Sequence, residues 1–293
     1  MALLAANILF GANFSLYVSL TQHGVSFQQI FILQLTVATF IFAPFVLLSK
    51  QSYHIALEDF GSIFIVSIIV VYGWMYMLLW GATETSPIDA SMIATLGPVV
   101  TLFISHIVHP QPISWIKVLG AIIAIAGTLA LMTNKNYHLL GTTNEAFGNA
   151  LVLFAVIAIA INTVLINKQL RIYGVLTIVG WYYIIGLIMA APFFYKDFLD
   201  IFSLSVSKIV IGELLYVTLL GTVLPMYLLY VGSRQLTAVH TALYRYIQPL
   251  VATALALLRG QSVLDHANII GAALIFSGVV VVVTGNIFPL RRG

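Results

Sequence analysis

The sequence has 293 residues, of which 61% are hydrophobic and only 7% are charged. A soluble domain has about 25% charged residues, so a water-soluble fold of this size could not cover its surface with so few charges. The chain has no cysteine, which excludes disulfide and thiolate chemistry. The net charge of +3 indicates no particular partner, and no feature predicts nucleic-acid binding.

Apolar runs recur along the whole chain, and as helices of about 20 residues each would cross a hydrocarbon core of about 30 Å. We therefore expect an all-α polytopic membrane protein with ten transmembrane helices. The first run has no basic leader, so we interpret it as a retained span and not as a signal peptide. The predicted spans are 2–20, 28–48, 60–82, 87–108, 114–133, 147–166, 175–195, 209–232, 238–258 and 266–287.

The distribution of Lys and Arg between the two ends of these spans predicts their orientation. One side has seven, which are Lys50, Lys117, Lys168, Arg171, Arg234, Arg291 and Arg292. The other side has four, which are Lys135, Lys196, Lys208 and Arg259. Both termini are therefore expected in the cytoplasm.

The two halves of the chain repeat each other. A shift of 151 residues aligns Pro98 with Pro249, and Asn13 aligns with Asn162 under a slightly shorter shift. The same shift of 151 aligns Met75 with Met226, Gly81 with Gly232, Gly120 with Gly271 and Gly127 with Gly278. Because it passes five spans, an odd number, we expect two inverted five-helix repeats, 1–133 and 147–288, joined by a loop at 134–146. Inverted repeats are typical of secondary transporters.

These motifs resemble the drug/metabolite transporter superfamily, and within it the ten-helix EamA-type members. The resemblance rests on Phe10-Gly11-Ala12-Asn13-Phe14, Leu96-Gly97-Pro98, Ile247-Gln248-Pro249 and the glycine pairs of spans five and ten. It implies alternating-access transport of amino acids or related metabolites, often exported, across a bacterial inner membrane. The chain departs from the family at Gln34, Pro110-Gln111-Pro112 and Gly260-Gln261-Ser262, so the substrate is not carried over.

Arg245 is the cation that cannot be placed in a loop or at a helix end. At helical spacing it shares one face with Thr241 and Gln248, beside Tyr244. A charge inside a membrane helix is costly and usually functional, and a guanidinium can hold a carboxylate in its fork of donors. The alternative is that Arg245, about 10 Å inside the membrane, reaches back to the cytoplasmic interface.

The repeat gives this polar face a counterpart in the first half. Ala90, Ala94 and Gly97 take the equivalent positions, which predicts a pocket that is polar on one wall and roomy on the other. The same small residues would also allow close helix packing.

Other polar and aromatic residues are weaker candidates. Glu213 lies about 13 Å from Arg245 in depth, and is either a proton-coupling carboxylate or an interfacial residue. Tyr76 and its counterpart Tyr227 could bind substrate, and Asn13 and Asn162 could line its path or join helices. Ser86-Pro87-Ile88-Asp89 predicts a helix N-cap, so we interpret Asp89 as structural.

No enzyme motif is present, and His106 and His109 have no carboxylate nearby to complete a metal site. We expect no catalytic residues, metal or cofactor. The expected partners are a small-molecule substrate, the lipid bilayer and a possible coupling proton, and the oligomeric state stays open. The alternatives are a transporter of an organic cation such as choline, using aromatics and Glu213, a channel-like facilitator and, more distantly, a membrane enzyme.

Overall fold

The computed structural model describes residues 1–48, 55–108, 114–132, 144–204, 207–234, 236–261 and 266–284. Within these ranges the regular elements are all helices. Seven helical segments are long and apolar enough to cross a membrane by length and composition, and Trp115–Gly127 and Ile269–Val282 are shorter apolar helices. Each predicted span falls on a helical segment, which confirms the all-α polytopic fold.

The first half of the chain contributes five helical segments. They are α1 (Ala2–Gln22), α2 (Phe27–Leu48), the run α3–η2–α4 (Leu57–Ile68, Ile69–Tyr76 and Met77–Glu84), the pair α5–α6 (Pro87–Ala94 and Gly97–Val108) and α7 (Trp115–Met132). Pro110-Gln111-Pro112, His109, Ser262 and most of the predicted loop at 134–146 lie outside the described residues.

The second half follows the same order, with one short helix added. It contains α8 (Glu145–Leu165), the short α9 (Asn167–Tyr173), α10 (Val175–Ile201), the run α11–η3–α12 (Lys208–Leu215, Tyr216–Val223 and Leu224–Ser233), the run α13–η4–α14 (Ala238–Leu243, Tyr244–Tyr246 and Ile247–Leu258) and α15 (His266–Thr284).

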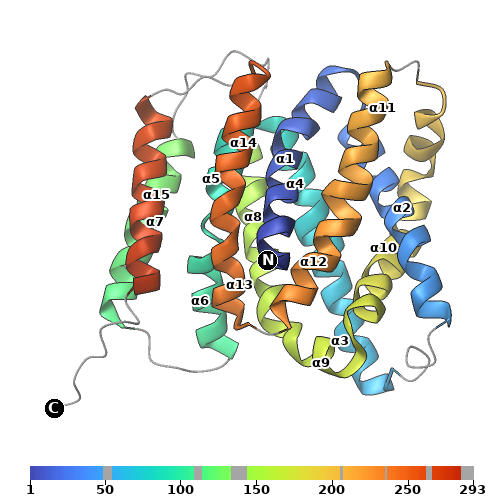
Figure 1. Cartoon of the computed structure of the whole chain (residues 1–293), viewed down its shortest axis with the longest axis horizontal. Helices are drawn as coiled ribbons and strands as arrows, with labels where there is room; N and C mark the ends of the chain where they lie inside the picture. Colours follow the sequence, from blue (N-terminus) through green and yellow to red (C-terminus); the bar gives the residue numbers. More distant parts are fainter. Residues whose placement is uncertain are drawn as a thin grey trace.

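Helices from the two halves pair with one another across the molecule (Figure 1). The helix α7 packs on α15 at one edge, and α2 packs on α10 toward the other. Between them, α4 contacts α8 and the equivalent α12 contacts α1. Exchanging the halves leaves these pairings unchanged, which is the arrangement expected of an inverted repeat.

The α7–α15 pair is held at close range by glycines. A Cβ on Gly127 would lie 2.8 Å from the carbonyl oxygen of Gly271, and a Cβ on Gly120 would lie 2.5 Å from that of Gly278. Such distances leave room for no side chain, so the backbones themselves are in contact. Small residues of this kind allow close packing of helices in a membrane.

Equivalent caps begin the fourth and ninth predicted spans. Ser86 Oγ accepts a hydrogen bond from the backbone N–H of Asp89 at 3.0 Å, with Pro87 in the first turn of α5. In the second half, Thr237 Oγ1 accepts from the N–H of His240 at 3.3 Å at the start of α13. The predicted N-cap before Asp89 is therefore confirmed.

Two π-helical segments, η2 and η3, interrupt the third and eighth predicted spans at equivalent places. Polar side chains bind carbonyl groups of η3. Asn13 Nδ2 donates to the Gly221 oxygen at 2.7 Å, and Gln34 Nε2 donates to the Val217 oxygen at 3.0 Å. Departures of this kind from the α-helix are frequent at functional sites, and the sequence did not predict them.

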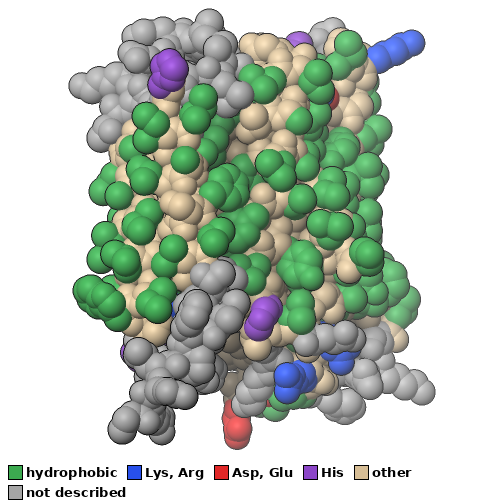
Figure 2. Space-filling view, turned by 60° about the vertical axis from the view of Figure 1, so that its left-hand side comes forward, with side chains coloured by type: hydrophobic (Ala, Val, Ile, Leu, Met, Phe, Trp, Pro, Cys, Tyr) green, Lys and Arg blue, Asp and Glu red, His purple; other side chains and the backbone are tan. Residues whose placement is uncertain are grey.

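The surface has the apolar belt of a membrane protein. Figure 2 shows hydrophobic side chains covering the middle of one face, with charged side chains near its upper and lower margins. Phe40 is 76% exposed and Phe193 is 79% exposed, on α2 and α10. Large apolar side chains so exposed are stable in contact with lipid.

Candidate functional site

A cavity lies between the two halves. Its walls come from α1, η2, α4 and α5 of the first half and from α8, η3, α12, η4 and α14 of the second. The polar lining residues are Asn7, Asn13, Tyr17, Thr222, Arg245 and Gln248. Most of the remaining wall is apolar, and includes Phe10, Phe14, Trp74, Met75, Leu78 and Met226. A mostly apolar cavity with a few convergent polar groups is the usual form of a small-molecule site.

Arg245 is the charged residue among the described lining residues. It lies in the short 3₁₀ segment η4, and only 7% of its surface is exposed. Among the residues that the structure describes, none forms a hydrogen bond or an ion pair with its guanidinium. The cavity therefore contains a buried cation whose charge no described carboxylate balances.

Gly97 provides the space in which the Arg245 side chain lies. A Cβ on Gly97 would come within 3.0 Å of Arg245 Cδ and 3.4 Å of its Nη1. Ala94 lines the same cavity, and Ala90 is buried. The structure thus brings Gly97, one of the small residues that the repeat pointed to, against the arginine of the second half.

Gln248 is positioned by α1. Its Nε2 donates to Asn7 Oδ1 at 2.7 Å, and Asn7 Nδ2 donates to the Leu3 oxygen at 2.7 Å. These bonds fix the Gln248 amide beside the cavity and join α14 to α1. Asn7 is a lining residue that the sequence interpretation missed.

Asn13 forms a second polar connection between the halves. Its Nδ2 donates to the Gly221 oxygen of η3 and, at 3.2 Å, to the Tyr17 hydroxyl. Gln34 donates to the same hydroxyl at 3.0 Å and to Thr222 Oγ1 at 2.7 Å. The amide of Asn13 therefore lines the cavity and also ties α1 to η3.

The remaining predicted site residues lie outside the cavity lining. Thr241 is buried, and its hydroxyl has no hydrogen-bond partner among the described residues, whereas Tyr244 is 37% exposed. Asn162 donates to the Tyr230 hydroxyl at 2.9 Å and accepts from the Tyr182 hydroxyl at 3.1 Å. The predicted stripe on the ninth span is thus divided: Arg245 and Gln248 reach the cavity and Thr241 does not.

Tyr76 and Tyr227 pack in apolar surroundings away from this lining. The Tyr76 ring centroid lies 5.0 Å from that of Phe31 and 5.7 Å from that of Phe194. Tyr227 is half-buried against the core. The structure brings neither tyrosine to Arg245.

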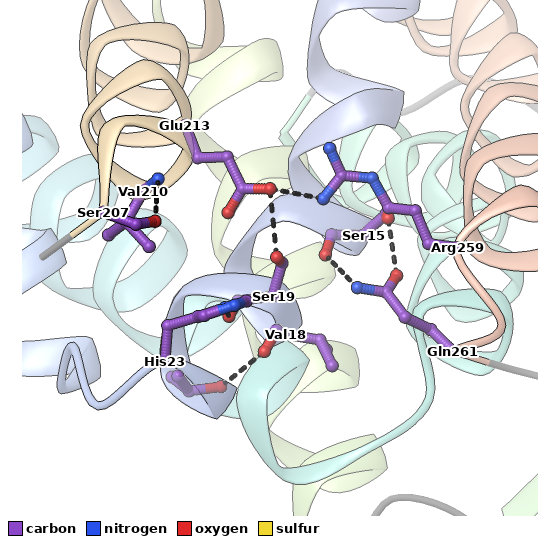
Figure 3. A network of polar contacts seen from close by, with 10 residues as sticks. Ser15, Val18, Ser19, His23, Ser207, Val210, Glu213, Arg259 and Gln261 are labelled. Atoms are coloured by element: carbon purple, nitrogen blue, oxygen red, sulfur yellow. Dashed lines mark hydrogen bonds and ion pairs between the residues drawn. The ribbon is translucent and has the colours of Figure 1, made fainter.

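Glu213 pairs with Arg259 and not with Arg245. The Arg259 Nη1 atom lies 2.5 Å from Glu213 Oε1, and Ser19 Oγ donates to the same oxygen at 3.0 Å (Figure 3). Among the described residues, Glu213 thus forms no ion pair with Arg245. Arg259 is a partner that the sequence interpretation had assigned only to a loop.

A second contact lies beside this ion pair. Ser15 Oγ donates to Gln261 Oε1 at 2.5 Å, and Gln261 Nε2 donates to the Ser15 oxygen at 3.0 Å (Figure 3). Together Ser15, Ser19, Glu213, Arg259 and Gln261 form what we call the α1 clamp. It joins the C-terminal part of α1 to α11 and to the residues that follow α14.

The sequence contained a signal for the missed face of α1. Asn7, Phe10, Phe14 and Tyr17 are separated by three or four residues each, so they fall on one side of the helix, as their place in the lining shows. Of the described residues, no group of three or more His, Asp or Glu lies close enough together to hold a metal ion.

Comparison with known proteins identifies the family. The chain matches the EamA-like transporter family over residues 1–133 and 146–284. It is 24% identical to the uncharacterized transporter YetK of Bacillus subtilis over 238 residues, which is 81% of this chain and 69% of YetK. It is 24% identical to an uncharacterized transporter of Archaeoglobus fulgidus over 86% of both chains.

Two further likenesses agree with this match. Protein PecM of Dickeya dadantii is 23% identical over 234 residues, covering 78% of this chain and 76% of PecM. A crystal structure with 16% sequence identity aligns over 95% of this chain and 94% of its own, with a TM-score of 0.64, which shows a shared fold. The protein is a multi-pass membrane protein and belongs to the EamA-like transporter family.

Proposed function

We propose that this transporter moves a small solute that bears a carboxylate, such as an amino acid or a related acid, by alternating access. The observation that carries the proposal is the buried, unpaired guanidinium of Arg245 in a cavity between the halves. Arginine presents its N–H groups in a planar fork that fits a carboxylate with two parallel hydrogen bonds.

The energetics favour a ligand at this position. Removing a cation from water costs several kcal/mol, and a partner of opposite charge at good geometry offsets that cost. Since none of the described residues supplies the partner, the bound solute would supply it. The charge then contributes to recognition and not to the stability of the empty protein.

For the transport cycle, we propose that the halves 1–133 and 147–288, joined by 134–146, move against each other around the cavity. The α1 clamp supports this proposal, because it links α1 to helices of the other half through Ser15 and Ser19. Opening the cavity at that end would break the clamp. If transport is coupled to protons, Glu213 is the carboxylate that we assign to the coupling, since protonation would release Arg259.

The orientation and direction are also part of the proposal. The Lys and Arg distribution supports a protein in a bacterial inner membrane with both termini in the cytoplasm, and we propose export. Right-side-out and inside-out vesicles that contain a single labelled solute would show the direction.

The organic-cation alternative has less support. It assigned the site to aromatics and Glu213, but Glu213 is paired with Arg259, and neither Glu213 nor Tyr76 is in the cavity lining. A channel-like facilitator differs from a carrier in its kinetics: a carrier gives saturable uptake and counterflow.

The test is counterflow in proteoliposomes with labelled carboxylate solutes, comparing the wild type with Arg245→Gln. Arg171→Gln is the matched control, because Arg171 is an exposed arginine on α9. The proposal expects saturable counterflow that Arg245→Gln abolishes and Arg171→Gln retains. Counterflow that is unchanged in Arg245→Gln would reject it, and unsaturable flux would support a channel.

A further inference from the structure

We infer that the preferred solute is an organic monoanion with an apolar body and no ammonium group, and not an amino-acid zwitterion. The inference rests on the proposed function, in which Arg245 binds the carboxylate. It follows from the hydrogen-bonding capacity that the described lining residues leave unused.

The cavity has an excess of donors. The Arg245 guanidinium carries five N–H groups, and none of them is bonded to a described residue. Trp74 also lines the cavity, and in the described part of the chain its indole N–H has no acceptor. An anionic group is the natural ligand for such a set.

Most acceptors of the lining already accept at least one hydrogen bond from a described residue. Asn7 Oδ1 accepts from Gln248, and the Gly221 oxygen accepts from Asn13. The Tyr17 hydroxyl lies within hydrogen-bond distance of the side-chain nitrogens of Asn13 and Gln34, which compete with a solute for its lone pairs.

Two other oxygens in the lining add little accepting capacity. Thr222 Oγ1 accepts from Gln34 and donates to the Val217 oxygen. Asn13 Oδ1 has no partner among the described residues, but it is fully buried and packed against Gly221. Of the side-chain amides, Gln248 Oε1 accepts from no described residue, and Asn7 Oδ1 keeps one lone pair.

An ammonium group has three N–H donors and no acceptor. Placed in this cavity, it would still leave a donor unsatisfied after bonding the Gln248 and Asn7 oxygens, and buried donors without partners are costly. It would also add a second positive charge near Arg245, whereas none of the described lining residues is acidic. A monoanion neutralises the cavity, and a zwitterion does not.

The apolar wall indicates what the rest of the solute is like. Phe10 and Trp74 meet edge to face with ring centroids 5.6 Å apart, and Met75, Leu78 and Met226 continue the surface. Such a wall favours an aryl or alkyl body, because burying apolar surface is the favourable term there.

The experiment uses three solutes that share a phenyl ring on two carbons and differ in the charged groups that these carbons carry. They are 3-phenylpropionate, phenylalanine and 2-phenylethylamine, and hexanoate with norleucine gives the aliphatic pair. Binding to the purified full-length protein is measured by tryptophan fluorescence titration and by thermal shift. We expect each plain carboxylate to bind at least about tenfold more tightly than the amino acid of the same skeleton.

Two variants test the cause. Arg245→Gln should remove the preference for the plain carboxylate over the amino acid, and Arg171→Gln should retain it. Gln248→Glu adds an acidic acceptor to the wall. It should weaken the binding of 3-phenylpropionate and reduce or reverse its advantage in affinity over phenylalanine. Melting temperature and gel filtration show that each variant is folded.

The outcomes separate the inference from the proposed function. If phenylalanine binds as tightly as 3-phenylpropionate, and Arg245→Gln weakens both, the inference is wrong and the carboxylate site stands. If 2-phenylethylamine binds best, or if none of the four solutes that carry a carboxylate binds, both proposals are wrong.

Discussion

Arg245 lies against Gly97, so closely that a Cβ on the glycine would come within 3.0 Å of the arginine Cδ. The two residues belong to different halves of the repeat, and their contact is made at the cavity. A substituent on Gly97 would displace the guanidinium without changing the charge of the site. Gly97 is therefore a position where geometry and charge can be tested separately.

We expect Gly97→Val to weaken carboxylate binding by about tenfold or more, because small displacements of a binding group have large effects. Equilibrium binding of labelled 3-phenylpropionate would measure the change. Gly61→Val is the matched control, since a Cβ on Gly61 meets nothing within 4 Å. Equal affinity in the two variants would mean that the Arg245 position is not set by Gly97.

Asn13 and Asn162 occupy equivalent places in the repeat but have different surroundings. Replacing either with Ala removes buried hydrogen bonds and should lower stability by about 1–2 kcal/mol. Asn13 lines the cavity and Asn162 does not, so only Asn13→Ala should also alter solute binding. Thermal unfolding and titration of both variants would check this, and an equal binding defect in Asn162→Ala would contradict the placement.

The α1 clamp should hold one end of the cavity closed. The chain has no natural cysteine, so a Phe14→Cys substitution gives a single thiol in the cavity wall. We expect Glu213→Gln to raise the rate at which a charged methanethiosulfonate reagent modifies that thiol. Glu58→Gln, an exposed carboxylate on α3, is the control.

The same pair can be tested by a double-mutant cycle. The effects of Glu213→Gln and Arg259→Gln on the free energy of unfolding should be less than additive, because each substitution removes the same ion pair. The expected coupling energy is about 0.5–3 kcal/mol. Additive effects on melting, together with an unchanged labelling rate, would contradict the clamp.

Tyr173 and Asp59 give a pH dependence outside the membrane spans. The Tyr173 hydroxyl donates to Asp59 Oδ2 at 2.6 Å, and this bond raises the pKa of Tyr173 above its usual 10.0. A raised pKa in the folded state contributes stability below pH 10, which is lost as pH rises through the folded value. We expect Tyr173→Phe to lower the melting temperature at neutral pH and to flatten its alkaline decline.

Local patterns in the sequence predicted much of this fold. Apolar length predicts spans, Ser86 with Pro87 predicts a cap, and the repeat aligns Gly120 with Gly271, because each depends on nearby residues or on the repeat. Arg245 stood out because a cation within a span has few structural explanations.

The parts that were missed depend on three-dimensional packing. The 3₁₀ segment η4 contains Arg245 and follows Thr241, so the two residues do not keep the ideal α-helical spacing that placed them on one face. Asn7 and Trp74 are ambiguous in a sequence, because a polar or aromatic residue in a span can face lipid, a helix or a cavity. The Arg259–Glu213 pair joins the ends of two spans. Span ends are predicted from hydrophobicity only to within a few residues, which is too coarse to pair these side chains.

The most direct test of the central claim is equilibrium binding of labelled 3-phenylpropionate to wild type, Arg245→Lys and Arg245→Gln. We predict that Arg245→Gln loses about 10–100-fold in affinity and that Arg245→Lys lies between, since lysine keeps the charge and loses the fork. Unchanged affinity in a folded Arg245→Gln protein would contradict the assignment of Arg245 to the solute.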